Sequence, residues 1–275
     1  MISADNQQAT QFPKEIGESS ETICQASRLS SELATLIALL FTDGCVSPKT
    51  VGKSWRIYFA NKSQNLIELF RICMIAVFDL DPDRVKIVEK KNANGMLTAI
   101  INSKEIGDDL VSRFGTFRTL KFNDGTLPDA RLPVEDLIAS NCVRVFLQAA
   151  FSCDGGASFY PFQEYGRRWF IRTIFLSCTH PNLRSDYVEL LNAVGIAARN
   201  VPGDGKIKIE NKENIKKFQE RIGFAEGTMV TDHSKFWRGY TKQAVLDLMV
   251  ASYENLDVIY DLPQFKRDDD IVQPA

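Results

Sequence analysis

The chain has 275 residues, of which 44% are hydrophobic and 25% are charged, and its formal net charge at pH 7 is −2. So high an apolar content excludes a wholly disordered protein, and no apolar run reaches the roughly 20 residues that a bilayer-spanning helix needs. The length is sufficient for two modest domains, each with a core of its own.

The charge is unevenly distributed along the chain. Residues 1–32 carry a net charge of −3 and residues 254–275 carry −4, so the body between them carries +5. Acidic ends around a basic body are compatible with binding DNA through one face. The polar start lacks the apolar stretch of a secretory signal, and the cysteines form no CxxC pair. We therefore expect an intracellular protein, cytoplasmic or organellar and not secreted, with reduced thiols at Cys24, Cys45, Cys73, Cys142, Cys153 and Cys178.

Residues 1–30 predict a flexible leader, and residues 31–125 predict a first half of alternating helices and strands. Apolar residues at helical spacing behind a serine cap indicate helices, whereas alternating apolar and polar residues indicate strands. Asn94-Gly95 indicates a tight hairpin turn. The expected elements are a helix over 31–43 capped by Ser30 or Ser31, a short strand after Gly44, a strand over 53–61, a helix from Ser63 to about Phe78, strands over 84–91 and 96–102, and a helix over 103–115.

The second half, residues 141–256, repeats this order after a linker over 126–140. The repeat is visible in single residues, since Asn65-Leu66 recurs as Asn182-Leu183. Each half therefore has the order α-β-β-α-β-β-α, which predicts an α/β fold of the α+β type. The expected elements are a helix over 141–154, strands over 157–164 and 168–178, a helix from Pro181 to near Gly195, strands over 197–201 and 206–210, a helix over 211–223, a further helix over about 242–256 and a loose tail over 257–275.

One motif occurs in both halves. Leu36–Gly44 reads LIALLFTDG and Leu147–Gly155 reads LQAAFSCDG, so that each is an apolar run of helical length ending in Asp-Gly. Small residues four apart, Ala38 and Thr42 in the first copy, allow two such helices to approach closely. The two aspartates, Asp43 and Asp154, then meet at one end of the packed pair. Two carboxylates repel each other unless a cation lies between them, so the repeat predicts a metal site.

The two copies resemble the LAGLIDADG motif of homing endonucleases, with the acid at the eighth position and glycine at the ninth. Their separation suits the monomeric, two-motif branch of that family, although several apolar positions depart from its consensus. The resemblance implies two halves related by a pseudo-twofold axis, with the motif helices packed at the centre and the sheets forming a DNA-binding saddle. It further implies a site-specific, metal-dependent endonuclease that cuts both strands of a long DNA target, leaves 3′ overhangs and is encoded within an intron or similar mobile element.

The resemblance also implies a set of metal ligands. These are the carboxylates of Asp43 and Asp154, with the backbone carbonyls of Thr42 and Cys153 as further oxygen ligands. Oxygen donors suit Mg²⁺, which bridges and neutralises the reacting phosphate. We expect Mn²⁺ to replace it, and Ca²⁺ to support DNA binding without cleavage.

A second tier of catalytic residues is implied around the metals. Asn61 and Lys62 end the second strand, where the family often has an amide and a lysine, whereas the second half has Cys178-Thr179 there. A family lysine also tends to lie before the last helix of each half. Lys121 and Lys235 fit by position, and Arg238 and Lys242 compete with Lys235.

The outward side chains of the two sheets are the candidates for contact with double-stranded DNA in successive major grooves. Arginine reads guanine with two hydrogen bonds, whereas lysine more often meets phosphate. In the first half the candidates are Lys53, Arg56, Tyr58, Arg84, Lys86 and Lys90; in the second they are Arg167, Arg168, Arg172, Lys206 and Lys208.

Two alternative interpretations stay open. The first is a binding protein on the same fold, either a maturase that assists splicing of intron RNA or a DNA-binding regulator that does not cleave. The second is a structural protein whose repeat serves only packing. Because both acids are present at the predicted seam, the endonuclease is favoured over both.

Overall fold

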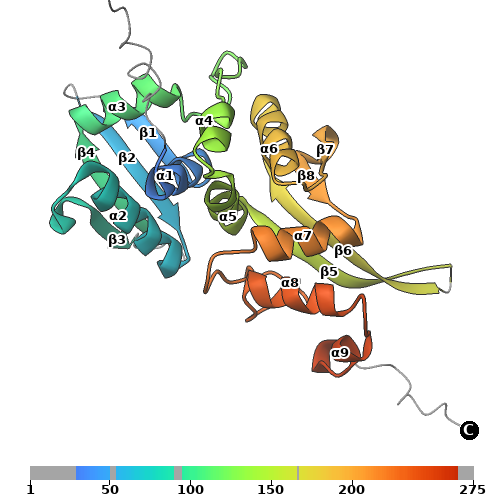
Figure 1. Cartoon of the computed structure of the whole chain (residues 1–275). Coiled ribbons are helices and arrows are strands. Elements are labelled where there is room, and N and C mark those ends of the chain that lie inside the picture. Colours follow the sequence, from blue (N-terminus) through green and yellow to red (C-terminus); the bar gives the residue numbers. More distant parts are fainter. Residues whose placement is uncertain (1–28, 50–53, 90–94, 166, 266–275) are drawn as a thin grey trace, which may run out of the picture.

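The computed structural model describes residues 29–49, 54–89, 95–165 and 167–265, with the backbone alone described at Arg167 and Arg168. The chain forms two halves, each a four-stranded antiparallel sheet with helices packed on one face (Figure 1). The strand orders are β1-β2-β4-β3 and β5-β6-β8-β7. The predicted α-β-β-α-β-β-α order and the α+β fold class are therefore confirmed. Within the described part of the chain, every helix is too short or too polar to cross a membrane.

The first half follows the predicted caps closely. Ser30, Ser63 and Ser103 each accept a hydrogen bond from the backbone N–H three residues later, which satisfies one free donor at the start of each helix. A short 3₁₀ helix, η1 (Pro82–Arg84), occupies the start of the strand predicted over 84–91. The elements are α1 (Ser31–Phe41), β1 (Gly44–Pro48), β2 (Trp55–Asn61), α2 (Gln64–Phe78), β3 (Lys86–Glu89), β4 (Leu97–Ser103) and α3 (Lys104–Phe114).

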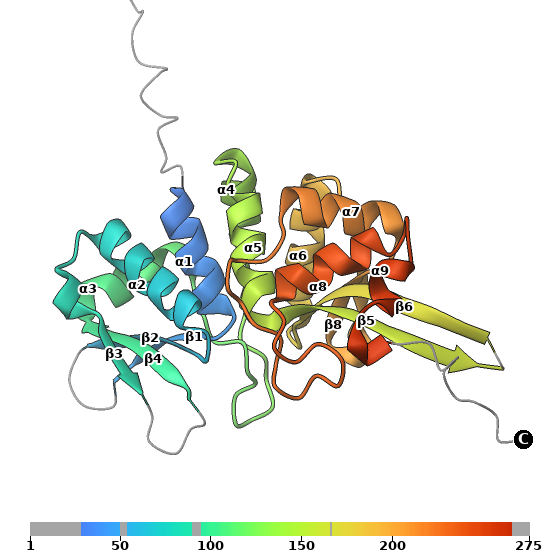
Figure 2. The same ribbon diagram turned by 90° about the horizontal axis from the view of Figure 1, so that it is seen from below.

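The second half differs from the first in its long hairpin. Its first two strands have 10 and 11 residues, against 5 and 7 in the first half. This hairpin extends well beyond the rest of its sheet (Figure 2). The elements are α5 (Val143–Asp154), β5 (Gly155–Glu164), β6 (Arg167–Ser177), α6 (Pro181–Ala193), β7 (Arg199–Val201), η2 (Pro202–Asp204), β8 (Lys206–Ile209) and α7 (Lys212–Arg221).

The motif helices α1 and α5 pack against each other at the centre, as predicted (Figures 1 and 2). Helix α5 passes directly into β5 at Gly155, whereas α1 reaches β1 through the turn Thr42-Asp43 and then Gly44. A Cβ atom on Gly44 would lie 2.5 Å from the Cα atom of Leu40, and one on Gly155 would lie 2.6 Å from the carbonyl oxygen of Phe151. Only glycine fits there, because any side chain would collide with the last turn of the helix.

The C-terminal segment corrects the loose tail predicted from residue 257. After α8 (Lys242–Ala251) the chain forms α9 (Asp257–Tyr260) and η3 (Pro263–Phe265). Phe265 is 1% exposed and stacks on Phe236 with ring centroids 5.2 Å apart. Residues 257–265 therefore belong to the core of the second half.

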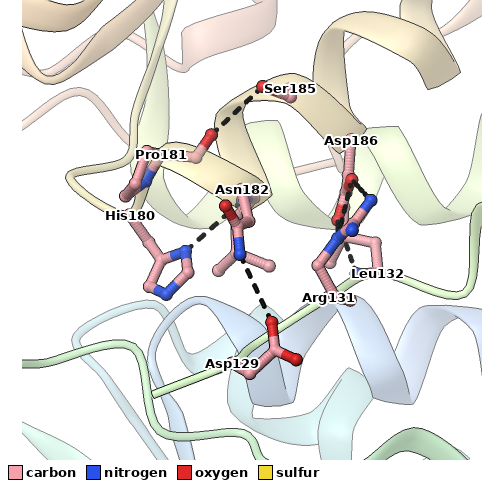
Figure 3. A network of polar contacts seen from close by, with 9 residues as sticks. Asp129, Arg131, Leu132, His180, Pro181, Asn182, Ser185 and Asp186 are labelled. Carbon is pink, nitrogen blue, oxygen red and sulfur yellow. Dashed lines mark hydrogen bonds and ion pairs between the residues drawn. The ribbon is translucent and has the colours of Figure 1, made fainter. Parts of the chain in front are cut away.

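The linker between the halves is fixed to the second half rather than loose, and it contains α4 (Val134–Ala139). Asp186 of α6 is 1% exposed and accepts hydrogen bonds from the Arg131 guanidinium, at 2.7 to 3.2 Å, and from the backbone N–H of Leu132 at 2.9 Å (Figure 3). His180, at the start of α6, bonds through Nε2 to the carbonyl oxygen of Pro128 at 2.8 Å. These contacts hold the connection from the first half against the second.

Candidate active site

The two motif acids lie at the C-terminal ends of the central helix pair. Asp154 is the last residue of α5, whereas Asp43 lies in the turn between α1 and β1. Both are partly buried. Burial and the neighbouring Asp43 carboxylate raise the pKa of Asp154 to about 7, and Lys242 opposes this shift. Burial also raises the pKa of Asp43, against the hydrogen bond from Asn61 and the charge of Lys242. The halves thus bring two carboxylates into one electrostatic environment.

Asn61 is the side chain that holds Asp43. Its Nδ2 donates to Oδ2 of Asp43 at 2.7 Å, and its Oδ1 accepts from the backbone N–H of Ser63 at 2.8 Å. The second bond fixes the orientation of the amide, so that its N–H groups point toward the acid. The next residue, Lys62, is exposed. Of this predicted pair, the structure brings the amide to the acid.

Lys242 is the lysine whose charge lowers the pKa of both acids, and the sequence suggested it only as a competitor of Lys235. Lys242 is 8% exposed, and its Nζ donates to the carbonyl oxygens of Ser152 at 2.7 Å, Cys153 at 3.2 Å and Gly155 at 2.7 Å. A positive charge at the C-terminal carbonyls of a helix is stabilising. Lys242 therefore holds the end of α5 that carries Asp154.

The two lysines predicted by position lie in loops beside the site. Lys235 is exposed and lines a cavity of about 540 Å³ together with Asp154 and Lys242. Lys121 is exposed in the loop that follows α3. Both loops lie on the same side of the molecule as the sheets, near the ends of α1 and α5 (Figure 2). No short-range sequence pattern singles out Lys242 instead, because its carbonyl partners lie far away along the chain.

The backbone carbonyls predicted as metal ligands are not equivalent. The Cys153 carbonyl already accepts from Lys242, which competes with a cation for that oxygen. The Thr42 carbonyl accepts no hydrogen bond from the described residues, and the Thr42 hydroxyl turns back to Ala38 O at 3.0 Å. Among the described residues no cluster of three or more histidine, cysteine, aspartate or glutamate side chains occurs. Two carboxylates and the Thr42 carbonyl form an all-oxygen donor set, which fits a hard cation that takes its remaining ligands from water and phosphate.

In the first sheet, Arg56 and Tyr58 lie on the face that the helices leave open. They alternate with the buried Ile57 and Phe59, and the Arg56 guanidinium lies 5.2 Å from the centre of the Tyr58 ring. Lys86 is exposed on β3. The prediction for Arg84 was wrong, because Arg84 belongs to η1 and lines a groove with residues of α2 and α3. Lys53 and Lys90 lie outside the described residues.

In the second sheet, Lys206 and Lys208 lie on the open face, but the prediction for Arg172 was wrong. Arg172 pairs across the hairpin with the buried Phe159 and donates to Ser252 Oγ at 2.8 Å. Its guanidinium lies 4.7 Å from the centre of the Tyr253 ring. It therefore packs beneath α8 on the core face.

The side chains of Arg167 and Arg168 lie outside the described part of the chain.

The sequence contained a signal for the direction of Arg172. Phe170, Ile174 and Leu176 point to the same face of β6 as Arg172, and all three are buried.

The open face of the same hairpin carries aromatic side chains that the sequence analysis missed. Tyr160, Phe162 and Trp169 are 37% to 40% exposed, and the Phe162 and Trp169 ring centroids lie 5.1 Å apart. Lys206 and Lys208 are partly engaged, since Lys206 lies over Phe175 and Lys208 pairs with Asp204 at 2.6 Å.

The predicted thiol state agrees with the structure: the five cysteines in the described part of the chain, all but Cys24, are free. Burial raises the pKa of the Cys153 thiol, the charges of Asp43 and Asp154 raise it further, and Lys242 opposes the shift. Cys153 therefore stays protonated at neutral pH and contributes its backbone rather than a thiolate to the site.

Residues 141–223 match a family model described as a LAGLIDADG-like domain. The resemblance inferred from the two motifs is thereby confirmed for this part of the second half. No curated protein matches the chain. Among solved structures, mesophilic variants of the homing endonuclease I-DmoI are 16% identical over 71% of this chain and 92% of that chain, with a TM-score of 0.44. The LAGLIDADG homing endonuclease I-SmaMI bound to cleaved DNA is 10% identical over 86% and 93%, with a TM-score of 0.47. I-WcaI bound to its DNA recognition sequence is 20% identical over 72% and 83%, with a TM-score of 0.41.

Proposed function

We propose that this chain is a LAGLIDADG homing endonuclease that acts as a monomer inside the cell and is encoded in an intron or similar mobile element. It binds one long double-stranded DNA site, hydrolyses both strands and leaves 3′ overhangs. The observation that carries the proposal is the pair of partly buried carboxylates, Asp43 and Asp154, contributed by different halves at the ends of two packed helices. The LAGLIDADG-like domain in residues 141–223 supports it.

Both acids are disfavoured in their charged form. Burial raises the pKa values of both carboxylates, and the Asp43 charge raises that of Asp154 further, so the charged pair gains more from a nearby cation than solvated carboxylates would. Mg²⁺ is the proposed cofactor, with Mn²⁺ as a substitute and Ca²⁺ supporting binding alone. Such a cation would neutralise the charge that develops on the phosphate and lower the pKa of a bound water.

The residues of the chain prepare this chemistry by holding the acids. Asn61 orients Asp43 through its amide, and Lys242 fixes the C-terminal turn that carries Asp154. Lys121 and Lys235, in the loops beside the site, are proposed to meet the reacting phosphate, and Lys62 follows Asn61 in the same role. A phosphate positioned by fixed groups reacts faster because its orientation is settled before reaction.

The DNA would lie across the open faces of the two sheets. In the first half the proposed contacts are Arg56, Tyr58 and Lys86, with Lys53 and Lys90; in the second they are Lys206 and Lys208, with Arg167 and Arg168. The Arg56 guanidinium, stacked beside Tyr58, is suited to reading a base edge. Arg172 and Arg84 are no longer proposed, since both point to the helical side.

A second candidate function is that of an intron RNA maturase. The observation that favours it is the aromatic open face of the long hairpin, where Tyr160, Phe162 and Trp169 are exposed. Aromatic side chains on a sheet stack on unpaired bases, which single-stranded RNA offers and duplex DNA does not. A regulator that binds only duplex DNA would give no reason for exposed aromatic side chains on this face.

The test is a cleavage selection with purified protein, Mg²⁺ and a library of randomised duplexes beside cloned intron-insertion sequences. We expect recovery of one long, partly symmetric site, and loss of cleavage in Asp154→Asn with binding in Ca²⁺ retained. If wild type binds a duplex but cuts none, the endonuclease is excluded in favour of a regulator. If it binds only intron RNA, the maturase is favoured.

A further inference from the structure

The two acids have different polar neighbours, and the pseudo-symmetry of the halves shows which positions to compare. The strand registers align Phe59 of β2 with Leu176 of β6, because each lies opposite the motif glycine. From there, equivalent residues lie 117 positions apart. Helices α2 and α6 obey this offset, since their N-caps are Ser63 and His180. Equivalent pairs near the site are Asn61 and Cys178, Leu66 and Leu183, and Phe70 and Tyr187.

The amide that supports the first acid is missing in the second half. Asn61 donates to Asp43 at 2.7 Å, but a thiol stands at the equivalent position, Cys178. The Cys178 Sγ atom lies 3.6 Å from the His180 carbonyl oxygen, to which it donates its proton. As a result, no side chain in the described part of the chain donates a hydrogen bond to the Asp154 carboxylate.

A cavity of about 160 Å³ lies beside Asp154, between the two halves. Thr42 and Thr119 line it from the first half, and Asp154, Cys178 and Tyr187 line it from the second. Its walls are polar enough, and its volume large enough, to hold several water molecules.

Tyr187 is the most buried of the hydroxyl-bearing residues that line this cavity. It is 2% exposed, and its ring packs against Phe146 with centroids 6.0 Å apart. Its hydroxyl forms no hydrogen bond with the described residues, and because Tyr187 lines the cavity, water there can satisfy it. Burial, with Cys178 and Asp154 nearby, raises the pKa of Tyr187 well above its ordinary value, so the hydroxyl keeps its proton. The equivalent Phe70 is buried and stacks on Phe59, without a hydroxyl.

We propose that Tyr187 is the positioning residue of the second acid: its hydroxyl donates, through water held in this cavity, to the Asp154 carboxylate. Tyr187 thereby does for Asp154 what the Asn61 amide does for Asp43. The first half has the Asn61 amide and the Phe70 ring where the second half has the Cys178 thiol and the Tyr187 phenol. Each acid therefore has one neutral hydrogen-bond donor. The inference rests on the proposed function only in taking Asp154 as a metal ligand.

The test is a calorimetric titration of the full chain with Mn²⁺ alone, without DNA. Tyr187→Phe removes the hydroxyl and leaves the ring that the first half has at Phe70. We expect it to weaken Mn²⁺ binding by about tenfold, the lower end of the usual effect of an outer-shell partner. Tyr253→Phe, which removes a hydroxyl elsewhere in the second half, is the matched control and should leave the affinity unchanged.

A rescue variant separates positioning from packing. Cys178→Asn in the Tyr187→Phe background places an amide where the first half has Asn61, and we expect it to restore Mn²⁺ affinity to within about threefold of wild type. Unchanged Mn²⁺ affinity in Tyr187→Phe, equal weakening in Tyr253→Phe, or a wild type that binds no Mn²⁺ would each overturn the inference. A wild type that binds Mn²⁺ but cuts no DNA would overturn the proposed endonuclease and leave the Tyr187 comparison valid.

Discussion

The two halves share one fold but stabilise their acids by different means. In the first half a short sheet carries Asp43, which a single amide from the end of β2 holds. In the second half Asp154 lies at the start of a long hairpin, and Lys242 from α8 holds the carbonyls of its helix. The repeated motif therefore fixes the position of each acid, while the side chains that surround the two acids differ.

The hydrogen bonds that join the two halves follow the pseudo-twofold symmetry more closely than the surroundings of the two acids do. Asn65 at the start of α2 donates to the Glu226 carbonyl at 3.0 Å, and the equivalent Asn182 of α6 donates to Asp129 at 3.4 Å. In each case the segment that follows the third helix of the repeat in one half, α3 or α7, reaches the first turn of a helix in the other. The packing of α1 on α5 is thus supported from both sides.

The largest effect on stability should come from Lys242. Lys242→Met removes the donor of three buried carbonyls and the one lysine that acts on both acids, so we expect a loss of about 3 kcal/mol in the free energy of unfolding. Urea denaturation measures it. Lys62→Met, the exposed lysine beside the first acid, is the control and should change the free energy by less than about 0.5 kcal/mol. If both variants lost the same free energy of unfolding, Lys242 would not have the special role in the second half that we assign to it.

A smaller effect on stability should come from the two acids, and it should depend on pH. The folded pKa of Asp154, about 7, lies above the ordinary 3.8, so its contribution to stability is present at low pH and is lost as pH rises toward 7. Without metal, Asp154→Asn should therefore be more stable than wild type at pH 8 by about 2 kcal/mol, below the ceiling of about 4 that three pKa units allow. The gain should disappear at pH 4.

The matched variant sharpens this prediction. Asp43→Asn should gain less at pH 8, because the hydrogen bond from Asn61 already lowers the pKa of Asp43 against the effect of burial. Unfolding curves with a chelator, at pH 4 and pH 8, decide the question. A gain for Asp154→Asn that does not depend on pH would contradict the account of its desolvated carboxylate.

The smallest effects should distinguish the open and core faces of the sheets. Arg56→Ala should weaken binding of the selected duplex by about 1 to 2 kcal/mol, since a side chain on the open face reaches DNA. Arg172→Met should leave DNA affinity unchanged and lower the unfolding free energy, because its guanidinium bonds to Ser252 beneath α8. Binding curves in Ca²⁺ and denaturation measure the two. A loss of DNA affinity in Arg172→Met alone would reverse the assignment of faces.

Local patterns in the sequence predicted much of the fold. The serine caps, the motif glycines and the alternation of Ile57 and Phe59 each depend on residues close in the chain, and the structure bears them out. These features require no knowledge of distant contacts. Asn61 was identified differently, through the resemblance to a family in which an amide often ends the second strand.

The features that were missed depend on contacts from far along the chain. Lys242 reaches α5 from the start of α8, and Arg172 turns inward because α8 covers a hairpin that extends beyond its sheet. Residues 257–265 looked like a tail, yet Phe265 fills a gap between Phe236 and Phe170. Whether a polar segment with a few aromatic residues is buried or exposed depends on its contacts with residues that are distant in the sequence.

The most direct test of the central claim, that one acid from each half binds a shared divalent cation, is anomalous diffraction from crystals of the protein with its selected DNA and Mn²⁺. We expect a manganese peak bound by the carboxylates of both Asp43 and Asp154, at about 2.1 Å from their oxygens, as for a hard cation. A peak held by one half alone, or no peak between the two acids, would contradict it.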